Sequence, residues 1–144
     1  MNRIVAVNVG NTNTTAALMA GRRVMRRVVV PTRGATPASA ARALARLRAG
    51  PVAGGIVASV VPRACRTWLR ALATAGIAPV FEVSAGLDLG VRLDYPHPET
   101  LGADRLANLA GIAGRTGRPV ITIDAGTATT VDAVTAEGVF IGGA

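Results

Sequence analysis

One motif occurs twice in this sequence, and the repeat restricts the fold more than any other feature. Val7–Thr12 and Ile123–Ala128 have the same shape, in which an apolar strand-like start leads into a glycine turn with neighbouring hydroxyl groups. Asn8 of the first copy corresponds to Asp124 of the second. In each copy a hydroxyl-rich second strand and another glycine turn follow. Because the two copies lie near opposite ends of the chain, the repeat indicates duplicated domains rather than a solenoid. We therefore expect two similar β-β-β units facing each other across a cleft.

The remaining pattern predicts alternating strands and helices. Apolar runs bounded by turns predict strands at Ile4–Val9, Thr15–Met19, Val24–Val30, Gly55–Val61, Pro79–Val83, Val120–Ile123, Val131–Val134 and Val139–Ile141. Helices are expected at Pro37–Arg48, from Pro62 to about Ala75, and from Thr100 or just after it to the glycines at 114–117. Leu87–Tyr95 is expected to be irregular or extended. We therefore expect an α/β fold with a mixed sheet, in which three antiparallel strands continue into parallel ones through helical crossovers.

Composition excludes several classes of site. All 16 basic residues are arginine, which rules out a Walker A lysine, a Schiff-base lysine and the β3 lysine of protein kinases. One Cys and one His rule out a disulfide framework and a Cys/His zinc site. The net charge of +8 suits an anionic partner, but aromatic residues make up only 3%, which favours small anions over nucleic acid. No apolar run is long enough to span a membrane and no signal peptide is recognisable, so a cytoplasmic protein is expected.

The two glycine turns suit phosphate binding. A glycine after a strand lets the backbone approach a ligand closely, so that N–H groups and Thr hydroxyls can meet phosphate oxygens. Asp124 could hold a cation or an incoming hydroxyl. Each turn alone is equally consistent with a Thr-rich hairpin, but two copies at matched positions favour the phosphate interpretation.

Three blocks carry a resemblance to a known family. Val7–Thr14, Tyr95–Arg105 and Asp124–Thr130, the last followed by Phe140–Gly143, resemble type III pantothenate kinase in sequence and order. That family belongs to the superfamily of acetate kinase, sugar kinases and actin. The resemblance implies a ribonuclease H-like (actin-like ATPase) domain at residues 1–117. It also implies the opening strands of a second, similar domain at residues 118–144.

The resemblance also implies a reaction, which is ATP-dependent phosphorylation of pantothenate to 4′-phosphopantothenate, the first step toward coenzyme A. ATP with Mg²⁺, a monovalent cation (K⁺ or NH₄⁺) and a homodimer are implied with it. Asp104 would be the catalytic proton acceptor, and Asp124 would bind the monovalent cation. Pantothenate would be contacted by Tyr95, Gly102, Ala103, Asp104 and Arg105. ATP would be contacted by Asn8, Val9, Gly10, Asn11, Thr12, Asn13, Thr14, Thr15 and Thr127.

Two features depart from the family pattern. The pattern begins with Asp, whereas this chain has Asn8, which keeps one acceptor oxygen but loses the charge that helps to organise Mg²⁺. The second copy of the repeat opens close to Ala144, where family members continue past Gly142 and Gly143. We therefore expect a fragment whose last three strands lack covering helices, and an apolar surface that makes it aggregation-prone or requires a partner.

Other interpretations of the sequence remain open. A non-catalytic remnant, or a Baf-type transcriptional activator that binds nucleotide or a partner, is the alternative function. Nucleic-acid binding would rest on charge alone, and salt-dependent DNA binding would test it.

Several candidate residues also have a purely structural interpretation. Asp104 could simply be an acid in the first turn of a helix, and Arg105 a solvated base. Tyr95 could be a packing residue. His97 is expected at the surface and Cys65 in the core.

Overall fold

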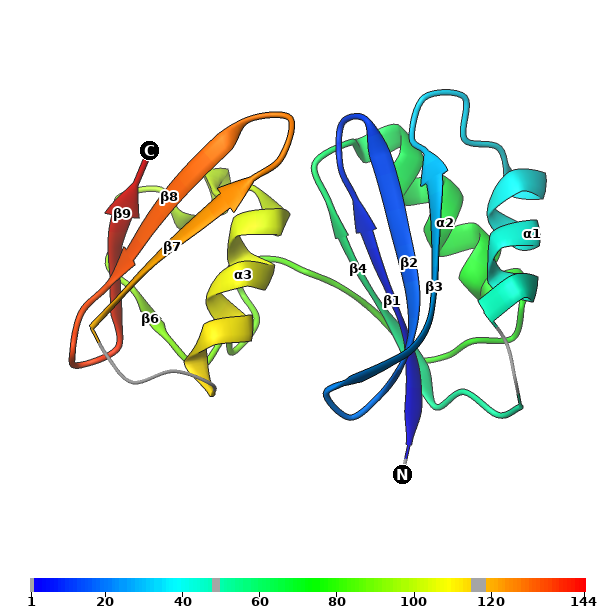
Figure 1. Cartoon of the computed structure of the whole chain (residues 1–144), viewed down its shortest axis with the longest axis horizontal. Coiled ribbons are helices and arrows are strands. Elements are labelled where there is room, and N and C mark those ends of the chain that lie inside the picture. The colour runs from blue at the N-terminus through cyan, green and yellow to red at the C-terminus, as the bar shows by residue number, and fades with distance from the viewer. Residues whose placement is uncertain (1, 48–49, 115–118) are drawn as a thin grey trace. The chain divides into compact units, whose positions relative to one another are not determined.

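The structure is a computed structural model that describes residues 2–47, 50–114 and 119–144, and it contains two compact units, Met1–Glu82 and Val83–Ala144 (Figure 1). The first unit contains β1 (Arg3–Val9), β2 (Asn13–Ala20), β3 (Arg23–Pro31), α1 (Pro37–Leu47), β4 (Gly54–Ser59), α2 (Pro62–Thr74) and β5 (Val80–Glu82). Its sheet has the order β3-β2-β1-β4-β5, with β1–β3 antiparallel and β4 and β5 parallel to β1. The predicted mixed sheet is confirmed.

Alternation along β1 decides which face of this sheet is buried. Val5 and Val7 point to the helix side, where Leu18 and Ala16 lie opposite them in the register of β2. α1 and α2 cover this face, and Trp68 of α2 is fully buried there. The other face carries the intervening, more exposed residues, so the unit has two layers with its core between sheet and helices.

Local sequence signals begin and end the two helices. At α1, the hydroxyls of Thr36 and Ser39 each accept the other residue's backbone N–H, at 3.1 and 2.9 Å, in a capping-box arrangement. α2 begins with Pro62, whose missing N–H costs nothing at the first helical position. It ends at Thr74 and is followed by Gly76, which has a φ of 70°, and the N–H of Ile77 donates to Leu72 O at 3.0 Å.

Cys65 lies in the core of the first unit, as predicted, and donates its S–H to Oε1 of Glu82 at 3.3 Å. Burial, with a contribution from the Glu82 carboxylate, raises the pKa of the Cys65 thiol to about 11. Only about one thiol in a thousand is then ionised at pH 8, and the thiolate is the reactive form.

We expect Cys65 to react with a disulfide reagent at pH 8 on the order of 100-fold more slowly in the native chain than in urea, where its pKa returns to about 8.5. Stopped-flow absorbance measures both rates. Raising the pH toward 10 should accelerate the native reaction. Equal native and unfolded rates at pH 8 would show that the thiol is accessible and ionised.

The second unit contains β6 (Arg92–Leu93), the 3₁₀ helix η1 (Pro98–Thr100), α3 (Ala103–Ala113), β7 (Val120–Ala125), β8 (Thr129–Val134) and β9 (Val139–Gly143). Its sheet has the order β6-β9-β8-β7. β7, β8 and β9 form an antiparallel meander like that of β1–β3, so the predicted β-β-β repeat is confirmed. The segment expected to be irregular or extended contributes the two-residue strand β6, which pairs in parallel with β9.

The expectation that no helix covers the last three strands is wrong for one of their two faces. α3 packs in the second unit, and its Leu106 and Leu109 are buried. On the strands, Val134 and Phe140 are buried on the same side, and Arg105 of α3 bonds to Asp132 of β8. The helix predicted to close the first domain therefore supplies a covering layer for the second sheet.

The opposite face of the second sheet remains exposed. Ile121 and Ile123 of β7 are each 69% exposed, and Ile141 of β9 is 58% exposed. Val131 lies directly across from Ile123 in the register of β8, so these side chains form one contiguous apolar patch. A patch of this kind promotes association.

We expect the chain to associate with increasing concentration, and Ile121→Thr together with Ile123→Thr to reduce this association. Threonine retains the β-propensity of the strand while removing apolar surface. Light scattering and sedimentation velocity measure the effect. Val24→Thr, at a 53% exposed position of β3, is the control and should change little. A wild-type chain that stays monodisperse at high concentration contradicts the prediction.

Two predictions fall outside the described residues. The expected boundary between residues 117 and 118 lies in the gap at 115–118, and the expected last residue of the first helix, Arg48, lies in the gap at 48–49. His97 is exposed, as predicted, with Nδ1 3.3 Å from Oε1 of Glu99. Within the described ranges, none of the helices has the length and apolar character needed to cross a membrane.

Candidate active site

The first glycine turn closes the hairpin between β1 and β2. Asn8 pairs with Thr15 near the ends of the two strands, and the N–H of Gly10 donates to Asn13 O at 3.0 Å. A Cβ on Gly10 would lie 3.1 Å from that oxygen, so the turn leaves little room for a side chain. Glycine therefore suits the closure of the hairpin, because a side chain would require a small shift of the Asn13 carbonyl.

Some residues of the predicted phosphate loop form hydrogen bonds within the fold. Thr14 is fully buried, and its Oγ1 lies 2.8 Å from Oγ1 of Thr32. The N–H of Thr32 in turn donates to Thr12 O at 2.9 Å. Val9 is also fully buried, whereas Asn8 and Asn11 are exposed. A ligand at this turn would meet the exposed amides and backbone rather than the Thr14 hydroxyl.

The second glycine turn, between β7 and β8, has a similar form. Asp124 pairs with Thr130 as Asn8 does with Thr15, and the N–H of Gly126 donates to Ala128 O at 3.0 Å. Thr127 lies exposed in this turn. The two copies of the motif thus agree in sequence and in overall form, but the second turn is one residue shorter, because Val9 pairs with Thr14 in the first copy and Ala125 pairs with Thr129 in the second.

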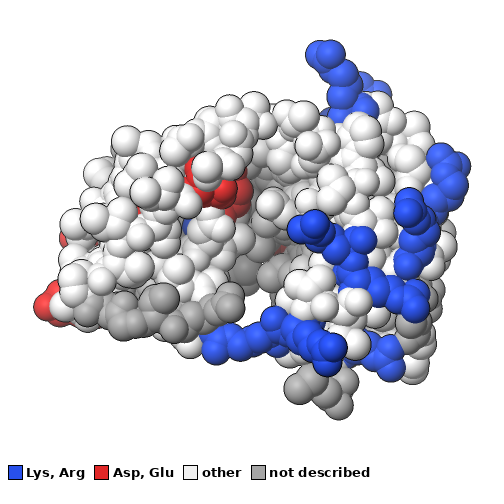
Figure 2. All heavy atoms as spheres, viewed as in Figure 1, with Lys and Arg blue, Asp and Glu red and all other residues white. Residues whose placement is uncertain are grey.

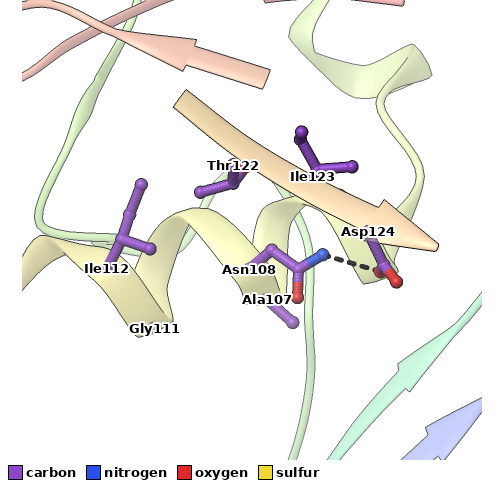
Figure 3. Close-up of a pocket in the computed structure, with 7 residues that line it drawn as sticks. All are labelled: Ala107, Asn108, Gly111, Ile112, Thr122, Ile123 and Asp124. Carbon is purple, nitrogen blue, oxygen red and sulfur yellow. Dashed lines mark hydrogen bonds between the residues drawn. The ribbon is translucent and has the colours of Figure 1, made fainter. Parts of the chain in front are cut away.

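Asp124 is held from the neighbouring helix. Nδ2 of Asn108, on α3, donates to Oδ2 of Asp124 at 2.9 Å, across the space between α3 and β7 (Figure 3). Both residues line a cavity of about 670 Å³ along the helix and the strand. Oδ1 of Asp124 has no partner within the described residues and is therefore open to a ligand.

Asp104 lies in the first turn of α3, directly after Gly102 and Ala103. It is half-buried, and its Oδ1 accepts the backbone N–H of Arg105 at 2.8 Å. A carboxylate at this position is stabilised by the positive end of the helix dipole. Asn108 follows four residues later on the same face of the helix, so Asp104 and the partner of Asp124 share one side of α3.

Arg105 is paired inside the protein. Its Nε and Nη2 both donate to Oδ1 of Asp132 on β8, at 3.0 and 2.5 Å, and Asp132 is only 3% exposed. The guanidinium also lies 5.9 Å from the ring centre of Phe140. The edge of the guanidinium formed by Nε and Nη2 is therefore occupied by Asp132. Nη1 has no partner within the described ranges and is available for a further contact.

Tyr95 joins the same cluster from the segment after β6. Its ring centre lies 5.9 Å from that of Phe140, with the rings tilted by 39°. At the end of β9, a Cβ on Gly143 would clash with the backbone oxygen of Val131 and would come within 2.9 Å of the Arg105 guanidinium. The cluster around Arg105 therefore depends on a glycine at this position.

The comparison with known proteins agrees with these motifs. The model of the type III pantothenate kinase family matches residues 4–144. The chain belongs to the type III pantothenate kinase family. The resemblance first seen in three blocks of sequence therefore extends over nearly all of it.

Individual relatives carry the same name. The type III pantothenate kinase of Rubrobacter xylanophilus is 37% identical over 98% of this chain and 56% of its own length. That of Akkermansia muciniphila is 35% identical over 92% of this chain and 52% of its own length, and that of Thermomicrobium roseum is 32% identical over 98% and 57%. The chain thus spans about half the length of the curated relatives it matches.

Solved structures of low sequence identity share the fold. An inorganic polyphosphate/ATP-glucomannokinase from Arthrobacter sp. has a TM-score of 0.50 at 19% identity, covering all of this chain and 62% of that one. A Ppx/GppA phosphatase from Aquifex aeolicus has a TM-score of 0.52 at 7% identity, covering all of this chain and 51% of that one. The predicted fold class, an α/β ribonuclease H-like fold with a mixed sheet, is confirmed.

Three residues of the candidate site, Asn108, Asp132 and Phe140, were not predicted from the sequence. Asn108 was missed although it follows Asp104 at helical spacing. Asp132 was missed although an acid inside the apolar run Val131–Val134 signals that a partner must exist. Phe140 lies in the third block of the resemblance, but no role was predicted for it. Within the described ranges, no three side chains of His, Cys, Asp or Glu are grouped so that they could hold a metal ion.

Proposed function

We propose that this protein takes part in ATP-dependent phosphorylation of pantothenate to 4′-phosphopantothenate, the first step toward coenzyme A. The observation that carries the proposal is the bond from Asn108 to Asp124. It connects the helix that begins at the predicted substrate block with the second glycine turn. Membership of the type III pantothenate kinase family supports pantothenate as the substrate.

Asp104 is the proposed proton acceptor. The primary hydroxyl of pantothenate attacks the γ-phosphorus of ATP, its proton passes to the Asp104 carboxylate, and ADP leaves. A half-buried carboxylate in the first turn of α3 suits this role, because a general base must lie within hydrogen-bond reach of the proton it takes. Phosphoryl transfer otherwise depends on positioning and charge stabilisation.

The proposed pantothenate contacts are Tyr95, the Gly102–Ala103 turn and Arg105. Arg105 would meet the pantothenate carboxylate through Nη1, because Asp132 occupies Nε and Nη2. Asp132 then acts as a positioning residue that fixes the guanidinium plane. This arrangement preserves a charge-assisted hydrogen bond while limiting the orientations that the substrate can take.

ATP is proposed to meet the turn from Asn8 to Thr15 and the hydroxyl of Thr127. Asp124 fits the proposed monovalent cation (K⁺ or NH₄⁺), because its exposed carboxylate is oriented by Asn108 and keeps one oxygen open. The cation would supply positive charge next to the phosphate chain. Asn108 would hold the carboxylate in position for it.

The residues at the first glycine turn do not fit Mg²⁺. This hard cation prefers carboxylate oxygens, whereas Asn8 offers a neutral amide and no Asp or Glu precedes Glu82 in the sequence. We therefore propose no Mg²⁺ ligand among the residues of the first unit. We further propose that the protein acts in the cytoplasm as a homodimer, in line with its family.

Calorimetric titration and product analysis test this function together. We expect saturable pantothenate binding to the chain, weakened by Tyr95→Ala, and ATP-dependent formation of 4′-phosphopantothenate detected by mass spectrometry. Replacing K⁺ by Na⁺ should lower the rate if Asp124 holds the monovalent cation. A chain that binds ATP but neither binds nor phosphorylates pantothenate would instead support the non-catalytic alternative.

A further inference from the structure

Charge is divided unequally between the two units. Residues 1–82 contain 12 of the 16 arginines and a single carboxylate, that of Glu82, whereas the other seven acids follow it. Figure 2 shows arginine side chains spread over the surface of the first unit. An anion that reaches the first unit therefore meets almost only positive charge.

Two of these arginines line one cavity. The cavity, of about 460 Å³, lies beside the first glycine turn and is bordered by Asn11, by the loop between β3 and α1, and by the start of α2. Arg33 lines it from the loop and Arg63 from the helix, and no acidic residue is among its lining residues. We call this site the arginine cavity.

Neither guanidinium is used by the fold. Among the residues that the structure describes, the side chains of Arg33 and Arg63 form no ion pair and no hydrogen bond. Glu82, the one acid of the unit, is engaged by Cys65. This contrasts with Arg105, whose guanidinium is paired with Asp132. The two arginines of the cavity thus keep their donors available for a ligand.

We propose that the arginine cavity binds a phosphate chain, and that Arg33 and Arg63 neutralise its charge without a divalent metal. The source of the chain is the nucleotide triphosphate of the proposed function, on which this part of the inference rests. Arginine suits the task because its planar fork matches phosphate oxygens and stays charged at any physiological pH. Asn11 adds an exposed amide at the edge of the same cavity.

The absence of carboxylates explains why the metal is dispensable in this cavity. Mg²⁺ commonly joins phosphate oxygens to protein carboxylates, and residues 1–81 contain none. Mg²⁺ bound to the phosphate chain would instead neutralise the charge that the two arginines recognise. We therefore expect Mg²⁺ to weaken binding in this cavity or leave it unchanged.

Titration calorimetry of the whole chain with inorganic tripolyphosphate, in EDTA and at physiological salt, tests the proposal. We expect one binding site per chain. Arg33→Gln and Arg63→Gln should each raise the Kd by about tenfold or more, as expected for loss of a charge-assisted hydrogen bond. The double variant should not bind measurably.

Two matched variants control for general attraction to a basic protein. Arg70→Gln removes the same charge from α2, but outside the cavity. Arg42→Gln changes a neighbouring cavity of about 360 Å³ that shares Arg33 but not Arg63. Both should bind tripolyphosphate within about twofold of the wild-type chain. A loss in either control equal to that in Arg63→Gln would overturn the assignment to the arginine cavity.

Metal and nucleotide arms complete the test. Tripolyphosphate that binds only when Mg²⁺ is present would overturn the metal-free mechanism. ATP should bind in EDTA and lose affinity in the double variant, and ATP binding that survives there would overturn the nucleotide as source. Because these readouts require no pantothenate, failure of pantothenate phosphorylation alone would contradict the proposed function and leave this inference standing.

Discussion

Asp104→Asn is expected to lower the rate of pantothenate phosphorylation by about 10²–10⁴-fold, the usual contribution of a general base. The amide has the size of the carboxylate but cannot accept the proton of the attacking hydroxyl. The structure predicts little damage to the fold, because an amide oxygen can still accept the N–H of Arg105. Quantification of 4′-phosphopantothenate over time gives the rate, and calorimetry should show ATP binding within about twofold of the wild type.

A binding experiment tests the same residue independently of turnover. The wild-type chain should bind pantothenate about tenfold or more tightly than an analogue without the primary hydroxyl, because a hydrogen bond to a charged group is worth about 1.5–3 kcal/mol. Asp104→Ala should remove this difference. Glu137→Gln, in the exposed turn between β8 and β9, is the control and should preserve it. If Asp104→Ala discriminates as the wild type does, Asp104 does not contact the hydroxyl.

Local signals explain why most of the fold could be predicted. β-branched runs and glycine turns define both β-meanders, and the proline at the first position of α2 marks its start, so each element is encoded within a few residues. β6 was not predicted as a strand of its own within a segment expected to be irregular or extended, because it has only two residues and gains its structure from β9, more than forty positions later. Strand propensity depends on such pairing more than on the residues themselves.

For a related reason, the sequence predicted some residues of the candidate site but not the contacts between them. Motifs pointed to Asp104 and Asp124, which occur at a helix start and in a turn. Nothing local indicated that Arg105 would be paired with Asp132, 27 positions away, or that Thr14 would be buried against Thr32. These contacts arise only when the strands and the helix pack together. Motifs therefore indicate which residues carry chemistry, and packing decides which of their donors remain available.

Asp132→Ala is expected to destabilise the second unit by about 3 kcal/mol. Asp132 is 3% exposed and Arg105 17%, so removing the carboxylate leaves a mostly buried guanidinium without its partner. Breaking a buried pair from one side costs about 3–5 kcal/mol, and the partial exposure of Arg105 favours the lower end. Urea unfolding followed by amide hydrogen exchange in β7–β9 measures the loss. Trp68, the single tryptophan, reports on the first unit by fluorescence and should not change.

The exposed pair of His97 and Glu99 provides the matched comparison. Its side chains are 74% and 69% exposed, and an exposed ion pair contributes about 0–1 kcal/mol, so Glu99→Gln should have little effect. A double-mutant cycle then isolates the buried pair, because Arg105→Ala combined with Asp132→Ala removes both charges and should cost less than the two single losses added together. If the losses simply add, or if Asp132→Ala costs no more than Glu99→Gln, Asp132 does not hold Arg105 in place. The substrate-binding orientation proposed for the Arg105 guanidinium would then lose its structural basis.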